Sequence, residues 1–596
     1  MRHLRGTDRN SQSQQPRSFP AARIGCGRTA LRQLAALALV ITRISVNGAQ
    51  AQKTGEVDYS AAVQRFEAIV REELTSGISS GVTVALVDNQ RIVYTRGFGF
   101  ADKGRRIPAA SDTVYRAGSI SKLFTALAAM QLVEQERLDI DQPITHYDAD
   151  FRIVIPFENA KPITLRQLMC HRAGMIREAP VGSYFDASEP GTARTVASLA
   201  SCVLVHPPDT KTKYSNSGVT IVGWIVEKVS KTAFEQYQQK HVLDPIGMHH
   251  SGWRLEPKLK QKLATGYLSV ADGNGGYREM RAPQFEFGIL PAGNLYTTAE
   301  DLARFLMFLF AEGRTDRGPL IRPETLAQMF TPQLTQNTNG FGLGFSVGNF
   351  RRHKTVSHMG AVYGFTSSLT AIPGQKIGAV VLCNDDIAAG PVRKLSSAAL
   401  SLMLEAKLGE TLPAPPPALK LRPEELAAFS GDFESESFWA EIQPGDGLLE
   451  AVISNQSVTL APTEPLKFEG SGRLVDRSPF LFERDSKGQV SGFTAMGQQF
   501  RRVAPNPAQE IPAEWKKFLG TYGPGFIPLI ISIKHGHLCA MTENEFDYRL
   551  TPVNQAVFKM PPGLYTDEHL VFQMDANGKV HSAVLANMPL RRRGGR

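Results

Sequence analysis

Long hydrophobic runs are missing from this 596-residue sequence. No stretch approaches the roughly 18 consecutive apolar residues of a membrane-spanning helix, so we expect no stable membrane span. Cysteine is also scarce, with five widely spaced residues and no C-x-x-C pair. This pattern predicts neither a zinc site nor a dense disulfide framework, and we expect no metal ion or other cofactor. Cys383 ends an apolar run and is predicted to be a buried small hydrophobe.

An acidic excess is missing as well, because the formal net charge is +9. Residues 1–51 contain eight arginines and a single acid, Asp8, so a net charge of +7 lies in this segment and only about +2 lies in the rest. Since the basic excess is confined to one end, the sequence does not predict a nucleic-acid-binding surface.

The basic segment at residues 1–51 has the order of a targeting sequence. Its arginines precede a short apolar stretch at residues 34–41, and Ala49-Gln-Ala51 follows as a small-residue cleavage pattern. We expect export to the periplasm or the extracellular space after cleavage near Ala51. Because the segment is rich in arginine and poor in acids, an organelle transit peptide is the alternative.

The patterns that follow predict a catalytic domain of the α/β (α+β) class over residues 52–410. Helical spacing is present at residues 59–74. Strands are predicted at residues 82–87, 92–94, 365–372 and 376–383. A long region of helices and loops separates the two strand pairs, so the sheet is expected to be closed by strands distant in sequence. A proline-rich stretch then predicts a linker at residues 411–420.

The sequence beyond the linker repeats itself. Phe429-Ser-Gly-Asp-Phe433 corresponds to Phe518-Leu-Gly-Thr-Tyr522 at an offset of 89 residues, and later matches keep an offset of 90. Short alternating segments with glycine turns predict two small antiparallel β-barrel domains, at residues 421–504 and 510–593. We expect these repeats to shape access to the catalytic cleft without supplying a catalytic residue.

The segment Ser119-Ile-Ser-Lys122 is an S-x-x-K sequence followed by a helical apolar stripe. It predicts Ser119 at a helix start and Lys122 on the same face one turn later. A helix N-terminus favours negative charge on the serine oxygen, and the N–H of Ser119 is free to donate to an oxyanion. Burial would lower the pKa of Lys122 towards that of a useful base. On its own, the same spacing also fits an ordinary serine N-cap.

Two further segments carry polar groups. In an extended backbone Tyr214 and Asn216 point the same way, so both side chains are expected to enter one cleft. There the tyrosine can pass a proton to a leaving group, and the amide can hold a substrate carbonyl and the lysine. In His358-Met-Gly360, glycine permits close approach of a substrate backbone, and the next N–H, of Ala361, is the candidate second oxyanion donor. Taken singly, these segments also fit an ordinary turn before a helix and a structural histidine.

The three motifs together resemble those of the serine β-lactamase-like superfamily, which includes class C β-lactamases, low-molecular-weight penicillin-binding proteins, and related esterases and D-aminopeptidases. Their order and separations, 95 and 144 residues, carry the resemblance. Supporting stretches lie at residues 115–122, 168–174 and 291–298. The resemblance covers about residues 57–405 and implies a helical domain beside an antiparallel sheet flanked by helices. It also implies an acyl-enzyme on Ser119 and a third motif that binds the carboxylate side of the substrate.

One departure from β-lactamases narrows the expected activity. They carry K-T-G where this chain has His358-Met-Gly360, and a neutral histidine attracts a carboxylate less than lysine does. Relatives with H-x-G include D-aminopeptidase-like members, which also resemble this chain in having two β-barrel domains after the catalytic domain. We therefore expect a serine hydrolase acting on amide or ester bonds of a small-molecule or peptide substrate. A β-lactamase or D-Ala-D-Ala carboxypeptidase is the alternative enzyme, and a non-hydrolytic ligand-binding or sensor protein is the alternative from another class.

Overall fold

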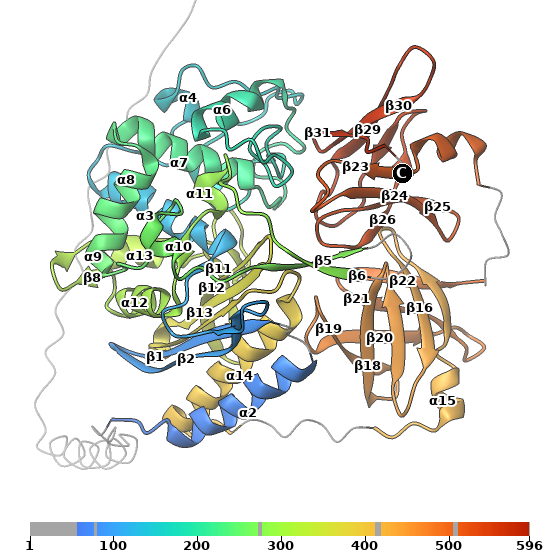
Figure 1. Cartoon of the computed structure of the whole chain (residues 1–596), viewed down its shortest axis with the longest axis horizontal. Coiled ribbons are helices and arrows are strands. Elements are labelled where there is room, and N and C mark those ends of the chain that lie inside the picture. Colours follow the sequence, from blue (N-terminus) through green and yellow to red (C-terminus); the bar gives the residue numbers. More distant parts are fainter. Residues whose placement is uncertain (1–55, 77–79, 272–276, 412–418, 505–510, 595–596) are drawn as a thin grey trace, which may run out of the picture. The chain divides into compact units, whose positions relative to one another are not determined.

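The central sheet joins the two ends of the catalytic domain, as Figure 1 shows for the computed structural model. The structure describes residues 56–76, 80–271, 277–411, 419–504 and 511–594; the expected leader and most of the expected linker lie outside these ranges. Strand β1 (Gly81–Asp88) pairs antiparallel with β14 (Ile377–Cys383), so the prediction that sequence-distant strands close the sheet is confirmed. Next to β1 lie β2 (Arg91–Asp102) and β3 (Ile107–Pro108); next to β14 lie β13 (Phe365–Ile372), β12 (His353–Val362), β11 (Ser346–Phe350) and β10 (Gly340–Phe341).

Helices pack on this sheet. Helix α14 (Ala389–Leu408) contacts β13, β14 and helix α2 (Ser60–Ser76), whereas α12 (Ala299–Phe310) contacts β1, β2 and β14. Every residue of β14 is buried, as expected for a strand that is covered on both faces. A Cβ atom at Gly378 of β14 would lie 2.9 Å from the side chain of Leu306 in α12, so the helix approaches the strand closely at this glycine.

A helical region lies between the early and late strands of the sheet. At its centre, α3 (Ser121–Glu134) packs against α7 (Asn216–Ser230) and α11 (Leu290–Gly293). Nearly all of α3 is buried, which explains why its sequence is apolar on more than one face. Shorter helices surround it: α4 (Ile144–Tyr147), α5 (Leu165–Met169), α6 (Thr192–Ala197), α8 (Phe234–Gln238), α9 (Asp244–Ile246), α10 (Pro257–Lys260) and α13 (Pro323–Met329). A helical domain beside an antiparallel sheet was the architecture expected from the sequence.

The first C-terminal repeat is a closed barrel. Its strands are β15 (Gly431–Glu434), β16 (Trp439–Pro444), β17 (Leu449–Ile453), β18 (Gln456–Glu464), β19 (Lys467–Gly472), β20 (Ser478–Arg484), β21 (Val490–Ala495) and β22 (Gln498–Val503). Pairing of β15 with β22 closes the barrel. Buried and exposed residues alternate along β17 and β18, as expected when one face of each strand lines the barrel interior.

The second repeat has two sheets instead of one closed barrel. One contains β23 (Gly520–Tyr522), β24 (Leu529–Lys534), β25 (His537–Met541) and β26 (Asp547–Arg549). The other contains β27 (Thr551–Pro552), β28 (Val557–Lys559), β29 (His569–Met574), β30 (Val580–Leu585) and β31 (Met588–Arg591). The stretch equivalent to β18 is interrupted at Leu550, so its halves, β26 and β27, pair with different partners. A bridge between Tyr522 and Arg592 joins the two sheets at their other edges.

Equivalent side chains make similar contacts in the two copies of the internal repeat. The guanidinium of Arg502 lies 4.8 Å from the ring centre of Phe433 in the first copy, and that of Arg592 lies 5.8 Å from the ring centre of Tyr522 in the second. Each arginine also donates to main-chain carbonyls just before the first strand of its copy. The same cation–π and hydrogen-bond pattern thus joins the last strand of each copy to its first.

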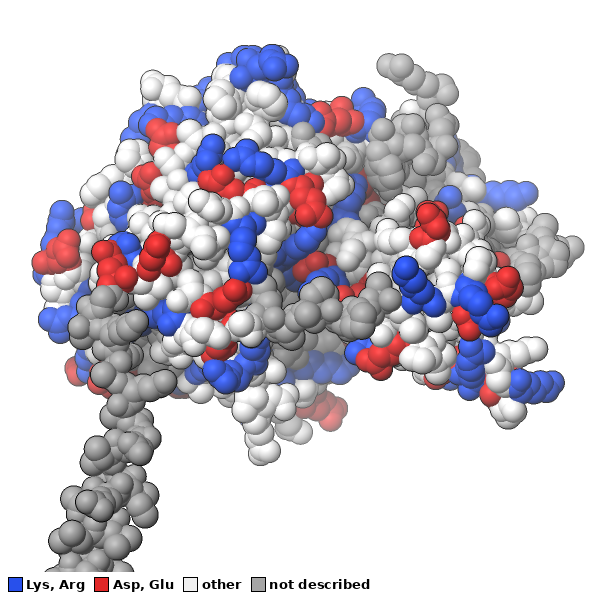
Figure 2. Space-filling model, turned by 90° about the horizontal axis from the view of Figure 1, so that it is seen from below, with Lys and Arg blue, Asp and Glu red and all other residues white. Residues whose placement is uncertain are grey.

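Over the residues that the structure describes, no helix combines the length and the hydrophobicity needed to cross a bilayer. On the face seen in Figure 2, lysine and arginine side chains are interspersed with aspartate and glutamate.

Candidate active site

Ser119 lies in a short turn that precedes helix α3. The turn, η1 (Gly118–Ile120), is a 3-10 helix, and α3 begins at Ser121, so the α-helix starts two residues later than the motif predicts. Gly118 has a φ angle of +54°, and a Cβ atom there would lie 2.8 Å from the Ala361 nitrogen. Only glycine fits this backbone and this close approach. The turn therefore brings Ser119 directly beside strand β12.

Lys122 is one turn after Ser119 and is 1% exposed. Its Nζ atom lies 2.9 Å from Ser119 Oγ and donates to the Ala292 carbonyl at 2.7 Å. Burial lowers the pKa of Lys122 well below its usual value, whereas the nearby carboxylate of Glu178 acts in the opposite direction. Burial thus shifts Lys122 towards the unprotonated amine, which is the state that a general base needs.

Tyr214 reaches the same hydroxyl. Burial raises the pKa of Tyr214 to about 12, and its hydrogen bond with Ser119 opposes that increase. Its ring packs against His171 at a centroid distance of 4.3 Å, and the Lys122 amine lies 4.9 Å from the ring centre. A phenol that remains protonated and touches the nucleophile is suited to deliver a proton to a leaving group.

Asn216 is placed by a helix start and not by an extended strand, which corrects the predicted backbone. Ser215 is the N-cap of α7: its hydroxyl accepts from the Gly218 N–H at 2.8 Å, and Asn216 is the first helical residue. The Asn216 amide donates to Glu178 Oε1 at 2.5 Å, while its Oδ1 atom is buried without a partner. A free acceptor in this position can bind a substrate N–H or the Lys122 amine.

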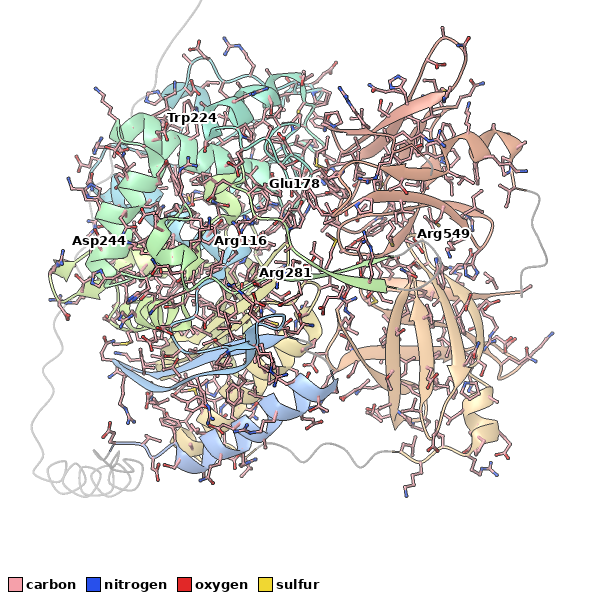
Figure 3. The ribbon with its side chains drawn as sticks, viewed as in Figure 1. Arg116, Glu178, Trp224, Asp244, Arg281 and Arg549 are labelled. Atoms are coloured by element: carbon pink, nitrogen blue, oxygen red, sulfur yellow. The ribbon has the colours of Figure 1, made fainter. Side chains whose placement is uncertain are left out.

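A buried ion pair lies behind Asn216. Glu178, labelled in Figure 3, is fully buried and lies 3.5 Å from the Arg177 guanidinium. Sequence reasoning did not identify either residue. His171 was also missed as a site residue, although it belongs to the 168–174 stretch that supports the family resemblance. Its Nδ1 accepts from the Ser215 N–H at 3.2 Å, and burial lowers its pKa well below the usual value.

The third motif lies within strand β12, which the sequence patterns did not predict as a strand. His358 is 6% exposed, its Nδ1 contacts the Met359 carbonyl at 2.5 Å, and its Nε2 atom has no partner. Burial and the nearby Lys122 lower the pKa of His358 to about 3. The imidazole is therefore neutral at ordinary pH and offers one unpaired ring nitrogen near the site.

Gly360 allows β12 to approach the nucleophile turn. A Cβ atom at Gly360 would lie 2.0 Å from the Ala117 carbonyl oxygen and 2.4 Å from Ser367 Oγ. The next residue, Ala361, is held in position by its carbonyl, which accepts a hydrogen bond from the Tyr184 hydroxyl at 3.0 Å. The structure thus brings together all seven predicted site residues, with Ser119 and Ala361 on adjacent segments as candidate oxyanion donors.

A cavity of about 140 Å³ continues from Ala361 to the second repeat. The catalytic domain contributes Arg177, Tyr184 and Tyr363 to its wall, and the repeat contributes Glu543 and Leu564. The second repeat therefore forms part of the wall of a cavity that also includes Ala361. Over the described ranges, no group of three or more side chains could hold a metal ion, and the four cysteines there are buried and unpaired.

Known proteins share this fold. The family model described as Beta-lactamase matches residues 66–402. Protein flp of Staphylococcus aureus (strain MW2) is 24% identical over 326 residues, which are 54% of this chain and 63% of that relative, so the match spans less than two thirds of the relative's length. The octameric penicillin-binding protein homologue from Pyrococcus abyssi is 22% identical with a TM-score of 0.53, over 82% of this chain and 99% of that one. The D-amino acid amidase from Ochrobactrum anthropi SV3 is 21% identical with a TM-score of 0.50, and the match covers 58% of this chain and 100% of the amidase chain.

Proposed function

We propose that this chain, which belongs to the Beta-lactamase family, is a serine hydrolase that forms an acyl-enzyme on Ser119 and cleaves amide or ester bonds of small peptides or esters. The observation that carries the proposal is the 2.9 Å contact between Lys122 Nζ and Ser119 Oγ in a buried setting that lowers the pKa of the amine. A purely structural role explains this contact poorly, because burying a lysine amine against a hydroxyl and a carbonyl costs desolvation and gains no direct ion pair.

In the proposed acylation step, Lys122 takes the Ser119 hydroxyl proton while Oγ attacks the substrate carbonyl carbon. The carbonyl π electrons move to oxygen, and the N–H groups of Ser119 and Ala361 stabilise the oxyanion. When the tetrahedral intermediate collapses, the bond to the leaving group breaks, and Tyr214 gives the leaving group its proton. Tyr214 then recovers a proton from Lys122, which leaves both residues in their initial states.

In the proposed deacylation step, water replaces the leaving group. Tyr214 or Lys122 removes a proton from the water as it attacks the acyl carbon, and Ser119 recovers its proton when the second tetrahedral intermediate collapses. The products are the free acid and the original enzyme. No group from outside the chain is required for the proton or electron balance.

The neutral His358 favours esters and small peptide amides over β-lactams as substrates. A lysine at this position would attract the carboxylate of a β-lactam, whereas a histidine with a pKa of about 3 carries no charge at neutral pH. The solved D-amino acid amidase is similar in fold only.

The test is a hydrolysis screen of p-nitrophenyl esters, D-amino-acid amides and a chromogenic cephalosporin, together with labelling by a fluorophosphonate probe. We expect turnover of an ester or amide and probe labelling that is lost in Ser119→Ala. The alternative reading as a binding or sensor protein predicts labelling or slow acylation with no turnover. Labelling of Ser119→Ala equal to that of the unchanged chain would refute the assignment of the nucleophile.

We also propose that the chain is exported and begins near Gln52 in its mature form. Support comes from the arginine-rich segment, the apolar stretch at residues 34–41 and the small-residue pattern that ends at Ala51. N-terminal sequencing of protein from its native host tests this. A start at Met1 would contradict it.

A further inference from the structure

One carboxylate of the second repeat is buried against two loops of the catalytic domain. The Oε1 atom of Glu568 accepts from Lys213 Nζ at 2.8 Å and from the Arg177 backbone N–H at 3.1 Å. Lys213 also donates to the Thr566 carbonyl of the same repeat at 2.8 Å. The Lys213 and Glu568 side chains are only 4% and 2% exposed. This is therefore a desolvated ion pair between segments far apart in sequence.

Both residues that Glu568 holds are next to site residues. Lys213 directly precedes Tyr214, and Arg177 directly precedes Glu178, which accepts from the Asn216 amide. The two loops are also joined to each other, because the Arg177 carbonyl accepts from the Asn216 N–H at 2.8 Å. The Lys213 N–H donates to the His171 carbonyl at 2.8 Å, so the same loop network reaches the histidine that packs on Tyr214.

We propose that Glu568 is a positioning residue for the proton-transfer side of the active site: it fixes Lys213 and Arg177, and through them holds Tyr214 and Asn216 against Ser119. The inference rests on the proposed function, because it concerns the reaction of Ser119. It assigns to the second repeat a role in leaving-group protonation in addition to forming part of the cavity wall. Glu568 touches no reacting atom and so is not itself catalytic.

The reason is geometric and electrostatic. An ammonium that is buried beside Tyr214 needs a counter-charge, and Glu568 supplies the carboxylate in direct contact with it. Without that carboxylate, Lys213 must move towards water and would carry the adjacent Tyr214 with it. Ser119 and Lys122 belong to η1 and α3, and the Lys122 amine is held by Ser119 Oγ and the Ala292 carbonyl, not by Glu568. Loss of the clamp therefore affects proton delivery more than attack by the nucleophile.

The experiment compares substrates that share an acyl group but differ in their need for a proton. A p-nitroanilide requires protonation of its leaving nitrogen, whereas a p-nitrophenolate and the fluoride of a fluorophosphonate leave as anions. In Glu568→Gln we expect kcat/KM for a D-alanyl p-nitroanilide to fall about 10²-fold through kcat, which is the scale of a small misplacement of a catalytic group. We expect kcat/KM for the matching p-nitrophenyl ester, and the rate of probe labelling, to stay within about threefold of the values for the unchanged chain.

A matched control keeps the test specific. Glu545→Gln also removes a buried carboxylate of the second repeat, one that pairs with Arg473 at 3.3 Å and touches neither loop. It should leave the anilide-to-ester ratio unchanged. Tyr214→Phe should show the same asymmetry as Glu568→Gln, and a larger one, because it removes the proton donor itself.

A second variant covers the case in which Glu568→Gln does not fold. If Glu568→Gln fails to fold, the double variant Glu568→Gln/Lys213→Met removes both buried charges at nearly constant volume and should fold with the same selective loss of anilide hydrolysis. An unchanged ratio in a folded variant, or equal losses in all three assays, would overturn the proposal. If the unchanged chain neither labels nor hydrolyses either substrate, the proposed function fails instead, which is a distinct result.

Discussion

The amine of Lys122 lies 2.9 Å from the hydroxyl oxygen of Ser119 and is held there by the Ala292 carbonyl. The acceptor belongs to α11, more than 160 residues away in sequence, so the position of the amine depends on packing between α3 and α11. In the unprotonated state that the proposed mechanism requires, the hydrogen bond to the carbonyl directs one N–H away from the serine and leaves the nitrogen lone pair for the serine proton. The pair therefore works as a unit.

Substitution of either member of this pair should abolish turnover. We expect Ser119→Ala and Lys122→Met each to lower kcat/KM by at least about 10⁴-fold, because a nucleophile and its base act together. The double variant should be no worse than either single one, and steady-state kinetics on the best ester will show this. Lys258→Met, at an exposed lysine of α10, is the control and should retain full activity. Additive losses in the double variant would mean that the two residues act separately.

The lowered pKa of Lys122 predicts how activity depends on pH. Only the unprotonated amine can accept the serine proton, so kcat/KM should fall as the pH decreases through the Lys122 pKa. Above that pKa, kcat/KM should stay constant until the alkaline range, because the pKa of Tyr214 is about 12. His358, with a pKa of about 3, cannot produce this acid limb. A pH series of kcat/KM measures it. The limb should keep its position in His358→Asn; its disappearance there would assign it to the histidine.

Replacing His358 by lysine should change the substrate preference. An ammonium at this position would attract a substrate carboxylate, so in His358→Lys we expect the ratio of cephalosporin to ester kcat/KM to rise by about tenfold, equivalent to about 1.4 kcal/mol. His358→Gln serves as the uncharged control and should not raise the ratio. Rates with a chromogenic cephalosporin and a neutral ester provide the measurement. No rise in a folded lysine variant would show that the third motif does not contact the carboxylate side.

Some of the site could be predicted because its signals are local. The S-x-x-K spacing places Ser119 and Lys122 one turn apart on any helical backbone, so their contact follows from the sequence. Gly360 and Ala361 were expected near the site for similar reasons. The backbone around Asn216 was predicted wrongly, because the Ser215 cap that starts α7 was overlooked.

Other features depend on contacts that no local pattern encodes. Glu178 becomes part of the site only because its loop packs on the start of α7, and Glu568 meets Lys213 across 355 residues of sequence. The repeat itself was visible in the sequence, since two copies keep a constant offset. The break at Leu550, which divides the second copy into two sheets, was not, because strand pairing there depends on the neighbouring segments.

Adding one methyl group at Gly360 should separate β12 from the nucleophile turn. A Cβ atom there would lie 2.0 Å from the Ala117 carbonyl oxygen, which is backbone and cannot rotate away. In Gly360→Ala, strand β12 must therefore shift and carry the Ala361 N–H away from the substrate carbonyl. We expect kcat to fall about 10²-fold to 10³-fold, the usual cost of losing one oxyanion donor, with a smaller change in KM.

The control for this steric argument lies on the neighbouring strand. A Cβ atom at Gly348 of β11 would meet only Thr355 Oγ1, at an ordinary contact distance of 3.6 Å. Gly348→Ala should therefore leave both kcat and the melting temperature near those of the unchanged chain, while Gly360→Ala lowers both. Ester kinetics and thermal unfolding followed by circular dichroism measure the two effects. If Gly360→Ala kept full activity, Ala361 could not be the second oxyanion donor, because the strand that carries it cannot stay in place once the methyl group is present.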